Sequence, residues 1–489
     1  MTATPILPRI SPVFGLRIFA VVACLWMAQR SPLAAQNMLV SPPLAIRNDY
    51  GYELVGRLRD RILLFRDRYD EFEMQAFDNQ MQLSWSKELD DIDKRGTQIL
   101  AVVGAKNDFS VIYKTRRRST TYLRIHKYDP GASLIDSMTV KNYGERVFET
   151  PVLDIVRSED KNCFVVYNTA GRGEIEATCF RLDKMQVLWD RKIYVEENYF
   201  DARVKDLAVS NLGEFFLVAQ DNNRRSKIEE HEYQIHCVSG DRDRIVRVPM
   251  EKHLTRDVFF TFDNQNRRLT AAGLFADKNR DRANGTFYLS VPAQDSAFVL
   301  RFNPFDDQFV SVVRGKEVED DSRGLANAEV QQVVLRRDGG VVLVGEQQQE
   351  VQRGTSAGRG FWREGVRLVI DYYYNDMFAI ALGPDGRPNW NTVLHKKQYS
   401  QDDEATFSSF FLFRMADRLH FLFNDEIKYE NTCSEYTLDP LGAFDRNSLL
   451  NTENQSLRLR FRDGLQLSAN ECLIPSEYRN KLRLVLLRY

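Results

Sequence analysis

The segment from Val333 to Gln398 decides the fold: it reads VVLRRDGGVVLV at 333–344 and MFAIALGPDGRPNWNTVL at 377–394. Each piece holds two apolar runs separated by a turn, Asp-Gly-Gly at 338–340 and Pro-Asp-Gly at 384–386. Glycine supplies the positive φ, and proline the preset φ, that a tight reversal requires. The pattern predicts four antiparallel strands, and four such strands make one blade of a β-propeller.

Between the two pieces, the second and third strands are expected to extend into one long inserted hairpin. Its arms are 347–351 and 366–374, and its tip is 353–363, with glycines at 354, 358 and 360. Long loops in compact domains are often functional, so this tip is the first candidate site.

The rest of the chain repeats the blade. The clearest marker is an apolar residue followed by Asp, a short turn, and a strand that often carries Trp. Asp78, Asp129 and Asp183 are 51 and 54 residues apart, and Asp385 and Asp439 are 54 residues apart. In such a turn Asp bonds its own backbone, and the Trp covers the contact between neighbouring blades. Repeats of this length with four strands each are typical of propellers.

The spacing predicts an all-β fold, a propeller of seven four-stranded blades with eight as the alternative, in a single domain over 37–489. In the tail, strands are expected at 464–467 and 482–487, one of which closes the ring by pairing with the N-terminal blade. The expected units are 50–90, 98–140, 150–195, 203–249, 256–315, 328–396 and 406–462.

The Asp turn and the Trp are locally similar to the repeat of quinoprotein-type propellers. The order of motifs also resembles that of uncharacterised secreted bacterial β-propeller proteins. Both resemblances imply a propeller architecture and supply no activity; nothing resembles a quinone site, and no cofactor is expected. The residues that carry the second resemblance are Asp338-Gly339-Gly340, Leu343 to Glu346, Tyr374-Asn375-Asp376, Trp390, Lys396-Lys397-Gln398, Leu422 to Asp425 and Leu473-Ile474-Pro475.

The first 36 residues are interpreted as a secretory signal peptide. Two arginines precede an apolar core at 18–28, and small residues stand at 34–35, which is the order of a cleaved leader. A membrane anchor is one alternative, but this core is short for a span. A lipoprotein signal is another, because Val-Val-Ala-Cys ending at Cys24 resembles a lipobox. The protein is therefore expected in the periplasm, on the outer surface or in the medium.

Charge is nearly balanced over the 489 residues, with 67 Lys and Arg against 69 Asp and Glu. Because the net charge is only −2, no global field favours nucleic acid or an anionic lipid surface. After residue 40, no apolar run reaches the roughly 20 residues that a membrane-spanning helix needs. The expected partners are envelope or extracellular proteins or glycans.

Export makes disulfides available. Cys163 and Cys179 flank an expected hairpin turn at 169–173, and their midpoint is residue 171. We expect the two cysteines to face each other across paired strands, within bridging distance. Two buried free thiols are the alternative.

The predicted binding residues all lie on the long hairpin: Arg353, Arg359, Trp362, Arg363 and Tyr373. In a blade, the loop between the second and third strands lies on the same face as the loops between blades. A Trp among three arginines is suited to binding a peptide, a glycan or a protein. A solvated insertion with Trp362 folded onto the blade is the alternative interpretation.

Glu346 and Asp376 lie at the root of the hairpin, and in an alternative interpretation they are catalytic residues. Two convergent carboxylates can perform acid–base chemistry, as in glycoside cleavage, and His395 and the acidic run 402–404 are close in sequence. Charged residues at a hairpin root are also commonly structural.

A metal loop is a third candidate, at Asp277, Asn279 and Asp281. Oxygen ligands at alternating positions are what a hard cation such as Ca²⁺ takes from a loop. A plain polar turn is favoured instead, because Arg280 and Arg282 add positive charge.

Together these patterns favour a non-enzymatic binding or scaffold protein that acts through loops on one face of a propeller. A polysaccharide hydrolase or lyase that uses Glu346 and Asp376 in the propeller funnel is the alternative.

Overall fold

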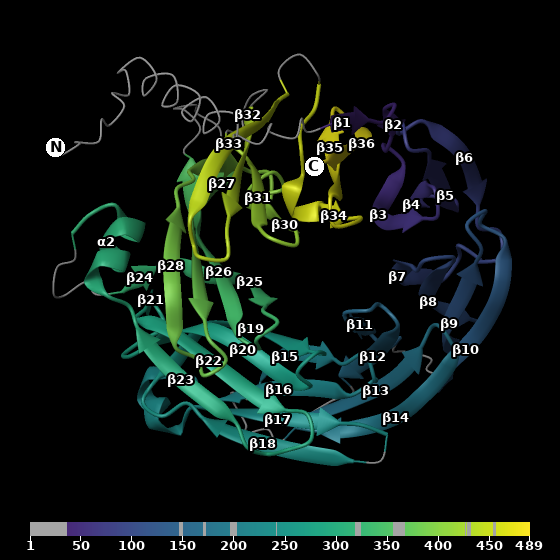
Figure 1. Ribbon diagram of the computed structural model, residues 1–489. Helices are drawn as coiled ribbons and strands as arrows, with labels where there is room; N and C mark the ends of the chain where they lie inside the picture. Colours follow the sequence, from purple (N-terminus) through teal and green to yellow (C-terminus); the bar gives the residue numbers. More distant parts are fainter. Residues whose placement is uncertain are drawn as a thin grey trace, which may run out of the picture.

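The computed structural model describes residues 37–145, 150–169, 173–195, 203–240, 242–317, 324–355, 367–425, 427, 432–452 and 456–489. Within these residues, eight antiparallel sheets of four or five strands stand in a ring, one sheet to a blade (Figure 1). The fold is the predicted all-β propeller. All seven expected units correspond to blades, and an eighth blade completes the ring.

In blades 1 to 7 the strands follow the chain from the central axis outward. Blade 1 contains β3 (Asp49–Leu58), β4 (Arg61–Arg68), β5 (Phe72–Phe77) and β6 (Leu83–Glu88), and blade 2 contains β7 (Thr97–Gly104), β8 (Phe109–Arg117), β9 (Thr120–Tyr128) and β10 (Leu134–Glu145). Blade 3 contains β11 (Asp154–Arg157), β12 (Cys163–Thr169), β13 (Glu174–Arg181) and β14 (Gln186–Tyr194), and blade 4 contains β15 (Arg203–Val209), β16 (Phe215–Asp221), β17 (Glu232–Val238) and β18 (Asp243–Pro249).

The second half of the ring has the same order. Blade 5 contains β19 (Leu254–Asp263), β20 (Arg268–Ala276), β22 (Gly285–Pro292) and β23 (Val299–Pro304), and blade 6 contains β25 (Ala328–Leu335), β26 (Val341–Thr355), β27 (Arg367–Leu382) and β28 (Pro388–Leu394). Blade 7 contains β30 (Phe410–Arg414), β31 (Leu419–Asn424), β32 (Thr432–Leu438) and β33 (Phe444–Asn451). Shorter elements lie between blades or between strands: η1 (Arg225–Glu230), β21 (Arg282–Ala283), α2 (Asp307–Arg314), β24 (Leu325–Ala326) and η3 (Phe461–Asp463).

Blade 8 is built from both ends of the described chain. It contains β34 (Leu465–Gln466), β35 (Glu471–Tyr478) and β36 (Lys481–Arg488), and its outermost strand is β1 (Asn37–Val40), with β2 (Leu44–Ala45) also paired to β36. The favoured count of seven blades is therefore wrong, and the alternative of eight is correct. Counting repeats missed this blade because it lacks the Asp turn and takes its outer strand from the other end of the sequence.

The predicted turns have the expected geometry. Gly339 and Gly386 have φ angles of 86° and 79°, in the left-handed region that glycine adopts without strain. The repeated Asp caps its own turn: Asp78 Oδ1 accepts hydrogen bonds from the backbone N–H groups of Gln80 and Gln82 at 2.9 and 2.8 Å. Asp129 and Asp439 do the same in blades 2 and 7.

The Trp residues of the repeat tie neighbouring blades together, as predicted. Trp189 Nε1 in blade 3 donates to the Gly213 carbonyl in the first turn of blade 4 at 2.9 Å. Trp390 Nε1 in blade 6 donates to the Pro440 carbonyl in blade 7 at 3.0 Å.

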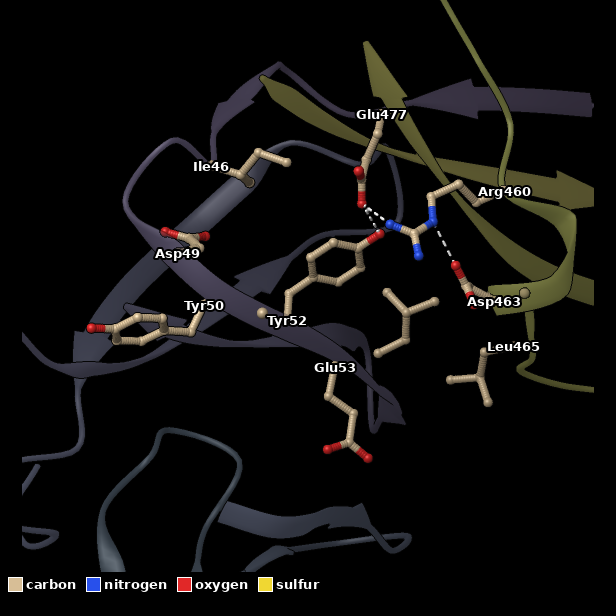
Figure 2. A pocket seen from close by; sticks show the side chains of 12 residues that line it. Ile46, Asp49, Tyr50, Tyr52, Glu53, Arg460, Asp463, Leu465 and Glu477 are labelled. Carbon is tan, nitrogen blue, oxygen red and sulfur yellow. Dashed lines mark hydrogen bonds and ion pairs between the residues drawn. The ribbon is translucent and has the colours of Figure 1, made fainter. Parts of the chain in front are cut away.

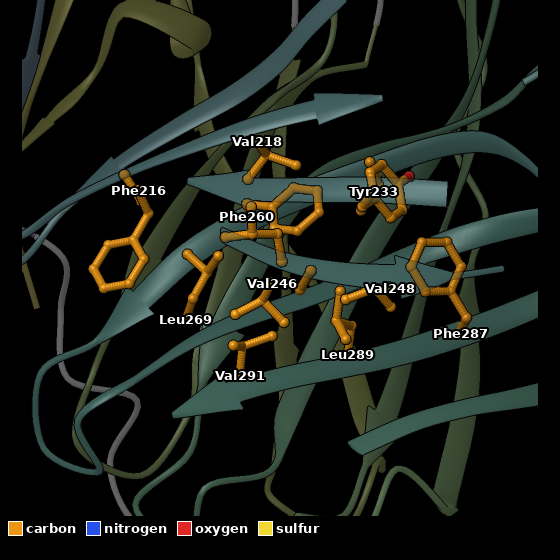
Figure 3. Close-up of a cluster of buried hydrophobic side chains, with 14 of the residues drawn as sticks. Phe216, Val218, Tyr233, Val246, Val248, Phe260, Leu269, Phe287, Leu289 and Val291 are labelled. Carbon is orange, nitrogen blue, oxygen red and sulfur yellow. The ribbon is translucent and has the colours of Figure 1, made fainter. Parts of the chain in front are cut away.

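The hydrophobic core lies between the blades. Figure 3 shows the cluster between blades 4 and 5, where Phe216, Tyr233, Phe260 and Phe287 are buried between the two sheets. β16 is buried along nearly its whole length because neighbouring blades cover both of its faces, whereas the outer strand β18 alternates between exposed and buried residues. Burial of each large apolar side chain contributes about 1.5–3 kcal/mol.

The long hairpin of blade 6 is present, with β26 and β27 paired from Val341–Leu382 out to Thr355–Arg367. A feature that the sequence did not indicate is a fifth strand, β29 (Gln398–Gln401), which pairs with the outer part of β27. The hairpin leaves the blade on the face that also carries the loops between blades, which we call the loop face. In the described part of the chain, no helix is both long enough and apolar enough to cross a membrane.

Cys163 and Cys179 are both buried free thiols in the structure. Their expected pairing is wrong in register: Cys163 lies opposite Arg181, and Cys179 lies opposite Val165. The hairpin is centred one residue later than residue 171, which moves the two cysteines from opposite to diagonal positions. Burial raises the pKa of the Cys163 thiol to about 11.

Candidate binding groove

Two cavities adjoin on the loop face where blades 8, 1 and 2 meet, and Tyr50 lines both of them. The larger has a volume of about 910 Å³ and lies over the β4–β5 turn and the connection from blade 1 to blade 2. The smaller has a volume of about 600 Å³ and lies between the start of β3 and the connection from blade 7 to blade 8. We call the two cavities together the acidic groove.

Two exposed tyrosines stand together in the groove. Tyr50 is 69% exposed and Tyr69 is 71% exposed, and their ring centroids are 5.9 Å apart. Tyr50 is the second residue of β3, and Tyr69 is in the tight β4–β5 turn. Aromatic side chains that remain exposed beside a cavity offer ring faces to a ligand.

The groove is strongly acidic. Six of the side chains that line the larger cavity are acidic and two are basic. Two of the six are neutralised within the protein, because Asp67 pairs with Lys94, and Glu71 pairs with Arg68. The other four have no basic side chain of the described chain within ion-pair distance; they are Asp70, Glu88, Asp90 and Asp93.

A polar network lines the smaller cavity, and Figure 2 shows it in close-up. The Tyr52 hydroxyl donates to Glu477 at 2.7 Å, and Arg460 pairs with both Glu477 and Asp463. Burial raises the pKa of Tyr52, and its hydrogen bond to Glu477 raises it further. Both carboxylates at this end therefore share the charge of Arg460, whereas four carboxylates of the larger cavity have no such partner in the described chain.

Two carboxylates at the bottom of the groove have structural roles. Asp49 forms a bidentate ion pair with Arg66, in which Nε and Nη2 of Arg66 donate to the two carboxylate oxygens at 2.8 and 3.0 Å. Glu53 accepts a hydrogen bond at 3.1 Å from the backbone N–H of Val102 on β7 and so links blades 1 and 2. Burial raises the pKa of Glu53, while that hydrogen bond lowers it by a smaller amount.

The structure places two of the predicted hairpin residues in a polar cluster on the outer part of the hairpin, where β29 pairs with β27. Arg353 makes a bidentate ion pair with Asp371, which also accepts a hydrogen bond from the Tyr399 hydroxyl at 2.8 Å. Tyr373 packs against Tyr399, with ring centroids 5.2 Å apart. The Arg353 guanidinium is therefore already paired. Arg359, Trp362 and Arg363 lie outside the described residues.

Glu346 and Asp376 do not converge on an open funnel. Glu346 is fully buried and pairs with Lys396 Nζ at 2.6 Å, and Ser409 Oγ donates to it at 2.7 Å. Asp376 instead accepts from His395 Nδ1 at 3.0 Å and from the backbone N–H of Lys396 at 2.9 Å. Burial lowers the pKa of Lys396, and the attraction of Glu346 opposes that effect.

The candidate metal loop is a surface turn with internal bonds. Asp277 pairs with His253 Nδ1 at 3.0 Å, and Asn279 accepts from the backbone N–H of Asp281 at 3.3 Å. Within the described ranges, no group of three or more His, Cys, Asp or Glu side chains is placed to hold a metal ion.

Sequence reasoning missed the acidic groove. Its signal was available in two polar runs of the first unit, RDRYDE at 66–71 and KELDDIDKR at 87–95, which fall in neighbouring loops of the loop face. The exposed Tyr69 between charged residues, in a tight turn that needs no aromatic, was the most specific clue.

No protein-family model matches the chain, and no curated protein matches it in sequence. Among solved structures, a europium-containing methanol dehydrogenase is 9% identical, with a TM-score of 0.41 over 92% of this chain and 93% of that one. A polysaccharide lyase is 7% identical, with a TM-score of 0.37 over 80% and 89%. The β-propeller domain of the Trilobed protease from Pyrococcus furiosus is 8% identical, with a TM-score of 0.34 over 85% and 99%. These values carry no inference about activity, and the fold rests on the strand pairing described above.

Proposed function

We propose that this protein is an exported, non-enzymatic binding protein, and that the acidic groove is its principal site. The single observation that carries the proposal is the exposed Tyr50–Tyr69 pair beside four carboxylates that no basic side chain of the described protein neutralises. The ligand that matches this chemistry is an extended, positively charged segment of an extracellular or envelope protein.

The argument for a cationic ligand is electrostatic. Lys or Arg side chains of a partner would pair with Asp70, Glu88 and Asp90 and lie over the faces of the two tyrosines. Lys94 already illustrates the second interaction, because its Nζ lies 5.3 Å from the centroid of the Tyr50 ring and 4.0 Å from that of Phe72. Complementary charge also speeds association and selects against acidic partners.

The long hairpin is proposed as a second contact of the same partner. Its described strands, β26 and β27, leave the propeller on the loop face, where the groove also opens. The contact residues predicted at its tip remain a prediction, with Trp362 as the anchor. A hydrolase or lyase that uses Glu346 and Asp376 is not favoured, because Glu346 is buried and paired with Lys396.

The direct test is calorimetric titration of the mature protein with an oligolysine peptide at low and at high salt. The wild type is expected to bind at low salt and to lose affinity as salt rises, because exposed charges are screened over about 8–10 Å. A variant with Asp70→Asn, Glu88→Gln and Asp90→Asn is expected to bind weakly at both salt concentrations.

Neutral glycans provide the contrasting ligand. If a neutral oligosaccharide binds the wild type and the triple variant equally, and oligolysine does not bind, the ligand assignment is overturned in favour of a sugar. Asp277→Asn is the matched control, since it removes an acidic side chain that lies outside the groove.

A further inference from the structure

The hairpin of β35 and β36 separates the acidic groove from a second pocket of opposite charge. In its register Ser476 lies opposite Arg483, and Tyr478 lies opposite Lys481. Because side chains alternate along a strand, these four share one face of the hairpin, while Glu477 points to the other face and into the groove. The second pocket has a volume of about 250 Å³, and its lining residues are Ser456, Ser476, Tyr478, Arg479, Lys481 and Arg483.

Among the residues that the structure describes, no acidic side chain lines this pocket, whereas three basic ones do. Arg479 and Lys481 are exposed, and neither has a carboxylate of the described residues within ion-pair distance. The Arg479 guanidinium instead lies 4.9 Å from the ring centroid of Tyr478. Arginine guanidinium groups and lysine ammonium groups placed together are the donors that proteins use to bind phosphate and related oxyanions.

A buried hydroxyl provides an independent observation. Ser476 is 1% exposed, and its Oγ accepts a hydrogen bond from the backbone N–H of Arg458 at 2.8 Å. That bond uses a lone pair and leaves the hydroxyl hydrogen, which donates to no acceptor in the described residues. Buried donors normally find an acceptor, so a donor that lines a basic pocket points to a bound anion.

We propose that this blade 8 pocket binds a tetrahedral oxyanion of the phosphate type. Ser476 would donate its hydroxyl hydrogen to one oxygen, and Lys481 and Arg479 would pair with the others. The shared chemistry is that of free inorganic phosphate and of a phosphate ester on a lipid headgroup. The inference is independent of the acidic groove, because it uses the opposite face of the hairpin.

The experiment titrates the full mature protein with inorganic phosphate in a chloride buffer and, separately, with vesicles of phosphatidylglycerol and phosphatidylcholine in equal parts. One-site binding of phosphate is the expected result. Binding of those vesicles but not of phosphatidylcholine alone would identify a headgroup as a source of the anion. Binding of neither probe would overturn the proposal.

Variants separate anion binding from folding. Arg479 has a φ of 51°, a conformation that glycine adopts more readily, so Arg479→Gly removes the charge without straining the turn. Combined with Lys481→Gln, it is expected to weaken phosphate binding about tenfold or more while the unfolding temperature is retained. Lys481→Arg is expected to retain binding, and Asp70→Asn in the groove is expected to have no effect on it. Unchanged phosphate affinity in the double variant would place the anion elsewhere and contradict the assignment.

Discussion

Glu346, at the root of the long hairpin, and Asp70, in the acidic groove, are both acidic residues of the loop-face region, but their surroundings differ. Glu346 is fully buried and is paired with the equally buried Lys396. Asp70 is exposed beside two exposed tyrosines, and no basic side chain of the described chain neutralises it. The charge of Glu346 is therefore used to anchor the connection that leaves blade 6. The charge of Asp70 remains available to a ligand. A difference in pairing, rather than in residue type, separates structural from functional carboxylates here.

The largest expected effect tests whether the buried Glu346–Lys396 pair stabilises the fold. Glu346→Ala leaves Lys396 buried without its partner, and such a loss typically costs about 3–5 kcal/mol. The free energy of unfolding, measured in denaturant, is expected to fall by about that amount. Glu346→Leu combined with Lys396→Met is expected to recover most of the loss, because it removes both buried charges. A negligible effect of Glu346→Ala would show that the pair is not structural.

The next effect tests whether the acidic groove binds a cationic ligand. Tyr50→Ala combined with Tyr69→Ala is expected to weaken oligolysine binding about tenfold, because two exposed cation–π contacts are lost. Stability should change by less than about 0.5 kcal/mol per site, as for most exposed positions. Calorimetric titration and thermal unfolding of the same samples measure the two quantities. A loss of stability equal to the loss of binding would mean that the tyrosines are structural.

A smaller effect compares two carboxylates of the groove, one without a basic partner and one with a basic partner. Asp70→Asn alone is expected to weaken oligolysine binding about two- to fivefold and to reduce its salt dependence, since one exposed ion pair contributes up to about 1 kcal/mol. Asp67→Asn changes a carboxylate that is already paired with Lys94. Its effect on binding should be the smaller of the two, and the reverse order would contradict the role assigned to pairing.

The smallest effect concerns Glu53, which belongs to the groove but bonds to blade 2. Burial raises its pKa above the ordinary value of 4.5, so the folded state holds the proton more tightly than the unfolded state. Its contribution to stability is therefore greatest below pH 4.5 and declines as pH rises through the folded-state pKa. Glu53→Gln keeps an oxygen for the Val102 N–H and should remove that decline. Unfolding measured between about pH 4 and pH 7 tests this.

The fold was predictable because its signals are local and repeated. Asp78, Asp129 and Asp439 cap turns of the same kind, and Trp189 and Trp390 each bridge to the next blade. The eighth blade was not predictable from the repeat, because β1 and β36 pair across almost the whole length of the chain.

The groove was harder to predict because it depends on which charges remain unpaired. Asp67 and Asp70 are three residues apart and chemically equal, yet only Asp67 has a basic partner, Lys94, which comes from the connection to the next blade. Tyr50 and Tyr69 meet only because β3 and β4 are paired. Glu346 drew attention for its position in a prominent hairpin, and only burial reveals that Lys396 neutralises it.

The most direct test of the central claim is hydrogen–deuterium exchange of the protein from residue 37 to residue 489, with and without saturating oligolysine. The account predicts protection in the segments that line the groove, 67–72 and 88–99, with little change at 346 and 376. Protection confined to other segments, with 67–72 and 88–99 unchanged, would contradict the claim that the acidic groove is the binding site.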